Sequence, residues 1–570
     1  MQKIYISAML SCLCMSLKAQ DSLKTVKLEE VVVTGNKTAT PIEQSGKTIF
    51  KLDQEQIEAN RGKDIADLLN EIPGVQIDGN FATPGTDISY RIRGAESEQT
   101  LILIDGIPYT DPTGTQQTFD LRLLNLDQVK SIEVLKGGLS SLYGTGAAAG
   151  VINITTKKTA QESIKCTINV EYGSFNTFTS NANFSGSVDK LSYMVSGSYR
   201  SSDGFSAALD TLENQDFDDD GIESLNFMGK IGYQFSDQFT IDAMAAYDDI
   251  QSDFDGGAFT DNDSDLDQQQ LRLAISPTYR WSGGKIKANI SYHTNDRVFD
   301  SPARNPGERS VSEFIGSTIQ ADLIFDQNLT DDIKLLGGIN YQRPESDFEG
   351  DDSEEFTMLD PYLSVIYGVE NFNLQVGGRL NNHSLYGSNF VWNINPSYLL
   401  DLEKGRLKLL ASYATAFRTP SLTELYGGDF GGFLASDAGN PDLEPQDSET
   451  VEFGFEFLND SQFQLGAVYF YRLDRDLIGF ISTFEDGVFD GSYENIGGKT
   501  EVDGLELNFS YDIAPQLTLA GHYTFTRSLN DEIILQRVPE RKFGFSATMR
   551  PTANFSLSLT HLHMGEVPET

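Results

Sequence analysis

The stretch that decides the fold is Thr177–Val188, TFTSNANFSGSV, in which polar and apolar side chains alternate. Successive side chains of a β-strand point to opposite faces, so this strand has one wholly polar face and one largely apolar face. A short turn at Val188-Asp189-Lys190 follows, and the alternation resumes over Leu191–Tyr199. The pattern therefore predicts an antiparallel hairpin with one apolar face.

The same alternation recurs along the rest of the chain, in Leu225–Phe235, Thr240–Tyr247, Leu271–Trp281, Ile286–Tyr292, Phe463–Leu473 and Leu517–Arg527. Each run has about the length that crosses a bilayer as a tilted strand, and many end in an aromatic residue. A soluble array of β-sandwiches also alternates in this way. The connections distinguish the two, and the deciding feature is their length.

Short turns recur near residues 189, 237, 283, 329, 369, 403, 460, 514 and 552. Between them lie much longer, acidic connections such as 201–224 and 248–270. Short turns on one side and long loops on the other are typical of an outer-membrane barrel, whereas a sandwich has no reason to sort its loops. The sequence therefore predicts an all-β transmembrane antiparallel barrel.

The turns also give a strand count of about 19, with Phe555–His563 as the last strand. A closed antiparallel barrel of this type has an even number of strands, and plugged barrels have about 22. An open edge in hydrocarbon is untenable, because its backbone groups would have no hydrogen-bond partners. We therefore expect the chain to stop about three strands short of a complete barrel.

Composition excludes some partners. The 570 residues carry 84 acidic and 42 basic side chains, a formal charge of −42. Such a chain repels phosphates, so we expect no nucleic-acid binding, and a metal cation is the better-matched partner. The five scattered His and the lack of a Ser-His-Asp or Cys-His arrangement give no support to an enzyme.

Residues 1–20, MQKIYISAMLSCLCMSLKAQ, have the order of a secretory signal peptide: a basic start, an apolar run and a small-residue exit. The apolar run is too short to span a bilayer. A lipoprotein signal ending at Cys12 or Cys14 is the alternative, although Met-Leu-Ser before Cys12 fits it poorly. After cleavage only Cys166 remains, and one thiol forms no internal disulfide.

Residues 21–158 differ from the rest and are typical of a compact α/β domain. Asp64–Leu69 has helical spacing and ends before Ile72-Pro73-Gly74. Three apolar runs bounded by Gly, Pro and Asp follow, and we expect them to be strands: Thr100–Ile104, Ser131–Leu135 and Val151–Thr155.

Motifs in both regions resemble those of TonB-dependent outer-membrane receptors. In the N-terminal region they are LEEVVVTG (28–35), IPGV (72–75), YRIRG (90–94), LIDG (103–106), IEVLKG (132–137), SLYG (141–144) and GVINITTK (150–157). In the barrel they are AFRTPSLTELY (416–426) and NPDLEP (440–445), and all of them stand in family order. The resemblance implies an energised receptor in the outer membrane of a Gram-negative bacterium, surrounded by lipid.

The resemblance also divides the chain. It implies a signal peptide (1–20), a TonB-box segment (21–40), an α/β plug domain in the lumen (41–158) and the transmembrane barrel (164–570), which we expect to be truncated at its C-terminus. Within the plug, Arg91 and Arg93 are expected to hold the plug to the barrel wall through carboxylates.

Energy for uptake would come from the inner membrane through the C-terminal domain of TonB, which binds the N-terminal peptide. Three successive valines favour an extended segment that can add to the edge of a partner sheet. The same residues could instead be the first strand of the plug. The implied TonB box is Glu30, Val31, Val32, Val33 and Thr34.

Two acidic loops point to a cation. Asp203–Glu223 contains eight acidic residues and no Lys or Arg, and Asp248–Asp267 contains eight more without a base. Asp216-Phe-Asp218-Asp-Asp220-Gly221 spaces three carboxylates two apart before a glycine, an arrangement that gathers oxygen ligands around Ca²⁺. It is not an EF-hand, because Phe227 stands where the bidentate Glu is needed. A solvated acidic loop is the alternative.

A second resemblance concerns the same loops, which are similar to the paired calcium loops of cobalamin receptors. Asp203-Gly-Phe205, the 216–221 run and Tyr247-Asp248-Asp249 carry it, although Ser206 stands where that subfamily has another Asp. The implied calcium ligands are Asp216, Asp218, Asp220, Tyr247, Asp248 and Asp255. The implied substrate contacts are Asp87, Ser89, Glu96, Gly114, Thr115 and Asp249, for which polar lining of a wet lumen is the alternative.

Together these patterns predict TonB-dependent transport of cobalamin or a related corrinoid, with calcium-ordered loops. Ferric-siderophore uptake by the same fold is the alternative. Acidic loops favour the corrinoid, since anionic siderophores need basic residues around the entrance. The plug disfavours a passive porin, and no motif supports an adhesin or an outer-membrane enzyme. A surface lipoprotein is a further possible partner.

Overall fold

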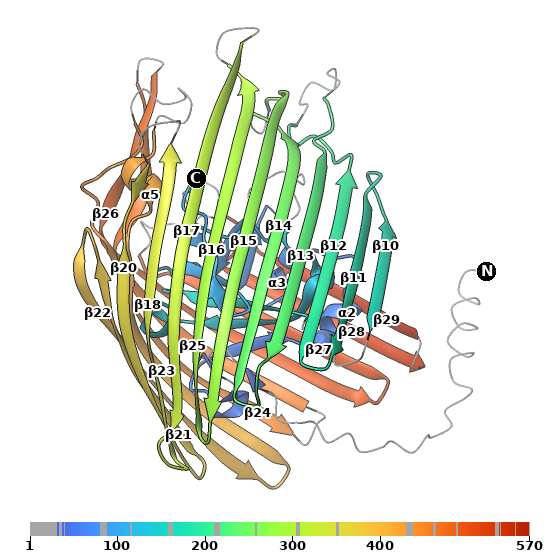
Figure 1. Cartoon of the computed structure of the whole chain (residues 1–570), viewed down its shortest axis with the longest axis vertical. Coiled ribbons are helices and arrows are strands. Elements are labelled where there is room, and N and C mark those ends of the chain that lie inside the picture. The colour runs from blue at the N-terminus through green and yellow to red at the C-terminus, as the bar shows by residue number, and fades with distance from the viewer. Residues whose placement is uncertain are drawn as a thin grey trace.

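The outer wall of the molecule is one antiparallel sheet that curves around a smaller inner domain (Figure 1). The computed structural model describes residues 31–32, 37–38, 40–79, 88–114, 117–157, 164–209, 217–256, 259–303, 308–348, 353–428, 437–459, 463–485, 488–530, 535, 537–552 and 555–568. Within this part of the chain, no helix is both long and apolar enough to cross a membrane.

The sheet contains 20 strands in chain order. They are β10 (Lys165–Tyr172), β11 (Phe178–Val188), β12 (Leu191–Ser202), β13 (Ile222–Gln234), β14 (Phe239–Phe254), β15 (Ser264–Trp281), β16 (Gly284–Pro302), β17 (Arg309–Asn328), β18 (Ile333–Phe348), β19 (Glu354–Glu355), β20 (Met358–Val369), β21 (Phe372–His383), β22 (Gly387–Leu402), β23 (Gly405–Arg418), β24 (Gln446–Asn459), β25 (Phe463–Glu485), β26 (Val488–Ala514), β27 (Leu517–Ser528), β28 (Arg541–Thr552) and β29 (Phe555–Met564).

The predicted barrel wall is confirmed. The two-residue β19 lies beside β18, which pairs mainly with β20, so the strands that run along the wall agree with the predicted count. Among the described residues, β10 pairs only with β11 and β29 only with β28. Consecutive strands join through short turns at one end, such as Asp189-Lys190, and mostly through longer connections at the other, although β21–β22 and β25–β26 are joined by short connections there too.

The two faces of the wall differ as the alternation predicts. In β11, Phe184 is 43% exposed on the outer face, whereas Asn181 and Ser185 are buried on the lumen side. In β12 its cross-strand partner Val195 is 58% exposed. An apolar exterior and a polar interior suit a sheet that meets lipid outside and a polar domain inside.

The inner domain is the predicted α/β plug. Its main sheet has the order β3-β8-β9-β6-β7, and a second sheet pairs β4 with β5. The strands are β3 (Ile49–Leu52), β4 (Val75–Asp78), β5 (Ser89–Ile92), β6 (Thr100–Ile104), β7 (Ile107–Pro108), β8 (Val129–Lys136) and β9 (Gly150–Thr156). The helices are α2 (Gln54–Ala59), α3 (Ile65–Asn70) and α4 (Ser140–Tyr143), with single 3-10 turns η1 (Ile42–Gln44), η2 (Ser97–Gln99), η3 (Leu121–Leu123) and η4 (Leu126–Gln128).

Local sequence explains these plug elements. The predicted helix is α3, which starts at Asp64 with a capping box formed with Asp67. The three predicted strands are β6, β8 and β9, and their apolar residues, such as Leu103 and Ile152, are fully buried in the plug core. The structure therefore confirms the α/β domain expected from the sequence.

Buried charges join the plug to the wall. Arg93 donates hydrogen bonds from Nε and Nη2 to the Glu506 carboxylate, at 3.0 Å each, and from Nη1 to Glu452. Lys136 lies 3.1 Å from the same Glu506. The Cβ of any side chain at Gly74 would lie 1.9 Å from Glu506 Oε1, and φ there is +65°, so only glycine fits. The expected anchoring role of Arg93 is thus confirmed.

Arg91 differs from that expectation. Its guanidinium pairs with Asp78, at 3.1 Å, and with Glu96, and both partners belong to the plug. Arg93 lies just beyond the end of β5, where φ is +55°, so the strand geometry is broken between the two arginines and their side chains reach different partners.

We predict that Arg93→Gln lowers the free energy of unfolding by about 3–5 kcal/mol, because it leaves two carboxylates buried without their guanidinium. Unfolding by guanidinium chloride in detergent would measure this change in the free energy of unfolding. The control is Arg406→Gln, which removes a partly exposed pair with Glu43 and should cost less than about 1 kcal/mol. Equal effects of the two substitutions would contradict the prediction.

Candidate functional site

Two long connections bring three carboxylates together at the end of the barrel opposite the short turns. Asp218 comes from the β12–β13 connection, and Asp255 and Asp261 come from the β14–β15 connection. Their oxygen atoms lie within 4.8 Å of one another. Asp261 Oδ1 is buried and has no hydrogen-bond partner. Carboxylate oxygens at this separation are the ligand type that hard divalent cations take.

Asp220 and Ser206 complete the surroundings of this group. Asp255 Oδ2 accepts hydrogen bonds from Ser206 Oγ (2.9 Å) and from the Ala208 amide (2.7 Å). Asp220 is 2% exposed, and its Oδ2 accepts from the Ala207 amide at 2.9 Å. Burial, together with the nearby Asp255 and Asp218, raises the pKa of Asp220 to about 6. Burial and the neighbouring Asp218 also raise the pKa of Asp261.

The structure brings together only some of the predicted calcium ligands. Asp218 and Asp255 meet, with Asp220 beside them, and Asp216 lies outside the described residues. Asp261 was not among the predicted ligands. The acidic residues of 248–267, a segment with no Lys or Arg, indicated a cation site in this loop. The sequence does not show, however, which of their carboxylates lie together in the folded protein.

Tyr247 and Asp248 lie elsewhere. Asp248 faces the lumen, where its carboxylate accepts from Arg272 Nη2 at 2.6 Å and from Asn226 Nδ2 at 3.0 Å. Tyr247 is on the opposite face of β14, and its hydroxyl donates to Asp249 at 3.2 Å. Asp249 therefore shares the outward side of the strand with Tyr247.

The predicted plug contacts differ in exposure. Ser89 is 4% exposed in β5, whereas the Glu96 side chain is 44% exposed and binds Arg91. Gly114 lies at a turn in which its amide donates to Asp111 O at 3.3 Å. Asp87 and Thr115 lie outside the described residues.

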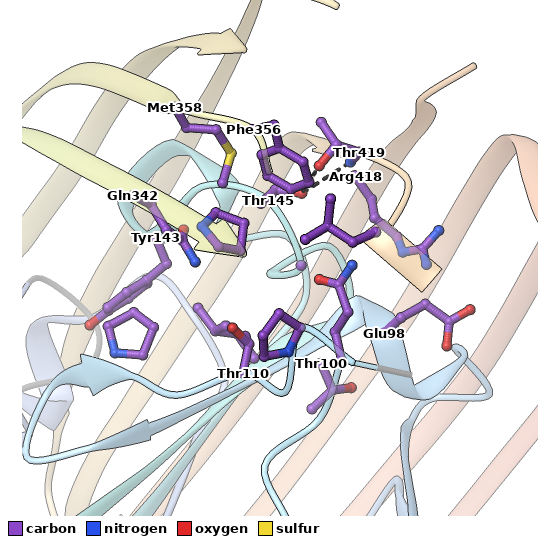
Figure 2. A pocket seen from close by; sticks show the side chains of 17 residues that line it. Glu98, Thr100, Thr110, Tyr143, Thr145, Gln342, Phe356, Met358, Arg418 and Thr419 are labelled. Atoms are coloured by element: carbon purple, nitrogen blue, oxygen red, sulfur yellow. Dashed lines mark hydrogen bonds between the residues drawn. The ribbon is translucent and has the colours of Figure 1, made fainter. Parts of the chain in front are cut away.

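A large cavity lies between the plug and strands β10 to β13. Its volume is about 620 Å³, and Gly79 and Ile88, which flank the segment containing Asp87, belong to its lining. Two ion pairs stand in its wall: Arg61 with Asp127 at 3.4 Å, and Arg200 with Asp64 at 2.8 Å. A second, much smaller cavity of about 40 Å³ lies between the plug and β18, β20 and β23 (Figure 2).

Part of the predicted TonB box is paired within the chain. β1 (Val31–Val32) pairs antiparallel with β2 (Thr40–Pro41), and Glu30, Val33 and Thr34 lie outside the described residues. The segment between these strands is tied to the wall near the short turns, where Lys37 pairs with Asp322 at 2.8 Å and Thr38 donates to Asp326 at 2.6 Å.

Comparisons with known proteins agree with this architecture. Residues 169–568 match the family described as "TonB dependent receptor-like, beta-barrel", and residues 41–151 match the TonB-dependent receptor plug domain. The vitamin B12 transporter BtuB of Photobacterium profundum is 26% identical over 463 residues, which cover 79% of this chain and 71% of that protein. An iron-regulated outer membrane virulence protein of Vibrio cholerae is 27% identical, over 90% of this chain and 79% of that protein.

Solved structures share the fold. A mutant of the ferric enterobactin receptor PfeA of Pseudomonas aeruginosa, in complex with enterobactin, superposes with a TM-score of 0.76 at 18% identity. The match covers 92% of this chain and 87% of that receptor. The family consists of transport receptors rather than enzymes. The chain, with its plug inside a wall of antiparallel strands, therefore belongs to the TonB-dependent receptors of the Gram-negative outer membrane.

Proposed function

We propose that this TonB-dependent receptor takes up cobalamin or a related corrinoid, and that calcium orders its outer loops. The observation that carries the proposal is the group formed by Asp218, Asp255 and Asp261. Two loops that are far apart in sequence place these carboxylates at one point, as a cation site requires.

Electrostatics explain why a cation matters there. Carboxylates held a few ångströms apart repel one another, and burial adds to the free energy of keeping them ionised. The raised pKa of Asp220 reflects both effects. A calcium ion would remove the repulsion and join the β12–β13 connection to the β14–β15 connection. Loops ordered in advance lose less conformational entropy when a ligand binds.

The cavity beside the plug favours a large neutral ligand with polar edges. Its basic lining residues all occur in ion pairs, such as Arg200 with Asp64, so donors and acceptors are available without a strong positive charge. The amide groups around a corrinoid ring match such a surface. An anionic ligand would gain little there, because the basic side chains are already neutralised.

Ferric-siderophore uptake is the alternative, and the similarity to the iron-regulated protein of Vibrio cholerae supports it. Uptake of an anionic siderophore would need basic side chains that face the ligand. Five arginines in the barrel, however, pair with carboxylates: Arg272 with Asp248, Arg297 with Asp111, Arg379 with Asp360, Arg418 with Glu424 and Arg472 with Asp474. The name of the Photobacterium relative, a vitamin B12 transporter, agrees with the corrinoid reading.

We further propose that Glu30–Thr34 binds the C-terminal domain of TonB by strand addition. In the described residues, Val31–Val32 makes only a two-residue pairing with Thr40–Pro41. So short a ladder is weak, and the segment could exchange it for the edge of a partner sheet.

Removal of calcium should weaken binding of cyanocobalamin to the purified receptor by at least about tenfold, or about 1.4 kcal/mol. Asp261→Asn should have a similar effect in the presence of calcium, because it removes a charged ligand oxygen. Asp263→Asn is the matched control, since Asp263 pairs with Arg309 instead. Isothermal titration calorimetry would measure these affinities. Tight binding of ferric enterobactin without binding of cyanocobalamin would favour the alternative substrate.

The loops should also respond to pH. The pKa of Asp220 is about 6 in the folded protein against an ordinary value of 3.8, so its proton stabilises the folded loops. The stabilisation of the folded loops by this proton is fully present below about pH 4 and is lost as the pH rises through about 6. In a calcium chelator, we expect the loops to resist limited proteolysis better at pH 5 than at pH 7.5. Asp220→Asn should remove the difference, and an unchanged difference in that variant would contradict the assignment.

Deletion of Val31–Thr34 should abolish energised uptake in cells while the affinity for ligand remains unchanged. The reason is that the deletion removes the strand that TonB would bind but leaves the plug and the loops intact. Radiolabelled cyanocobalamin would report binding to outer membranes and accumulation in cells. Loss of both activities would show that the segment is instead needed for the plug to fold.

A further inference from the structure

One segment of the plug projects into the barrel wall. We call Tyr109–Gly114 the plug tip; it follows β7 and immediately precedes Thr115, a predicted substrate contact. Tyr109, Asp111 and Thr113 are 1%, 7% and 2% exposed, so the tip is buried although it has no regular secondary structure. A buried irregular segment must have its polar groups satisfied by neighbours.

Two side chains of strand β16 bind polar groups of the tip. His293 Nε2 lies 2.7 Å from Thr110 O, and the His293 ring packs on the ring of Tyr109 with 5.3 Å between centroids. Arg297 Nη2 donates to Thr113 Oγ1 at 2.7 Å and lies 3.4 Å from Asp111 Oδ2. The guanidinium is therefore bound to two residues of the tip.

Two residues of the tip, Asp111 and Thr113, also bind each other. Asp111 Oδ1 accepts hydrogen bonds from the Thr113 amide (2.9 Å) and from the Thr113 hydroxyl (2.6 Å). Arg297, Asp111 and Thr113 thus form a closed ring of polar contacts. A charge-assisted ring of this kind fixes geometry better than the same contacts made separately.

The barrel wall has a glycine, with no side chain, where the tip packs against it. A Cβ at Gly316 of β17 would be 2.6 Å from Thr113 Cγ2 and 2.7 Å from Pro112 Cγ, so a side chain at this position would displace the tip. On another side, Thr423 of α5 (Leu422–Tyr426) donates from Oγ1 to Thr113 O at 2.9 Å. Because α5 lies in the long β23–β24 connection, the tip contacts two separate parts of the barrel.

The tip is not packed tightly on every side. Pro112, Gln117 and Leu422 also line the small cavity of about 40 Å³, which has Thr110 and Thr100 on one side and Thr145 and Thr419 on the other (Figure 2). At ~10–15 Å³ for each water, a space of this size holds a few water molecules. Contacts with the wall, rather than uniform packing, therefore set the position of the tip.

We propose that His293, Arg297, Gly316 and Thr423 form a socket that positions the plug tip for ligand binding, with Arg297 as its central positioning residue. The inference rests on the proposed function, in which the ligand lies against Gly114 and Thr115. The socket holds the segment before these residues in its bound position in the empty receptor. Binding then does not have to order the tip, so the socket contributes to affinity through preorganisation.

The first test needs no ligand. In a Cys166→Ser background, Gln117→Cys would carry a nitroxide label just beyond the tip, and its mobility would be read by electron paramagnetic resonance. Arg297→Gln should increase the mobility of the label, and Arg297→Lys should do so less. Arg309→Gln is the matched control, because Arg309 is bound to three aspartates and not to the plug. A label equally mobile in Arg297→Gln and wild type would overturn the proposal.

The second test uses cyanocobalamin as the probe. Arg297→Gln should raise the KM of uptake about tenfold and leave the maximal rate unchanged. Arg297→Lys keeps a cation beside Asp111 and Thr113, so its KM should stay within about threefold of the wild-type value. An unchanged maximal rate in both variants also shows that they are folded. A KM in Arg297→Lys as high as in Arg297→Gln, or wild-type affinity in Arg297→Gln despite a mobile label, would overturn the proposal.

The two tests separate the two proposals. If the wild-type receptor does not bind cyanocobalamin, the proposed substrate is wrong, and the label at residue 117 still decides whether the socket positions the tip. If cyanocobalamin binds but the label does not respond to Arg297→Gln, the substrate stands and the socket is overturned.

Discussion

The rest of the structure depends on one constraint: a barrel wall that is apolar towards lipid is polar towards its lumen, because its side chains alternate. A domain that fills such a lumen can bury only part of its interface by apolar packing, as where Met194 and Ile250 of the wall join the plug core. Polar groups of the plug must each pair with a polar group of the wall. Arg93, which pairs with Glu452 and Glu506 of the wall, is the clearest case. A few apolar wall residues join the plug core, and charges and hydrogen bonds make much of the remaining interface.

An interface of this kind suits a transporter. Hydrogen bonds and ion pairs are directional, so they position the plug accurately, as Arg297 does for the plug tip. They can also be exchanged for water as contacts separate, which makes their net contribution smaller than that of an apolar core. A plug held in this way is placed precisely, and its polar contacts could still exchange with water if TonB binds the N-terminal segment as proposed.

Some acidic residues of the wall and the outer loops are paired with a cation and others are not. Some have a cation built into the protein: Asp248 pairs with Arg272, and Asp263, Asp265 and Asp300 all pair with Arg309. Asp218, Asp255 and Asp261 converge without a basic side chain in the described part of the chain. The distribution of the net charge of −42 therefore matters more than its size, because these three carboxylates lie together without a basic side chain.

The sequence by itself determined the wall and the plug elements. Alternation in Thr177–Val188 is a local property with a period of two, and short turns fix which strands are neighbours, so strand order and the polar lumen follow directly. Only the tertiary structure decided which charged residues meet. Arg91 stays within the plug, Asp248 turns to Arg272, and Asp261 joins Asp218, because such contacts depend on the direction of each side chain and on partners far away in sequence.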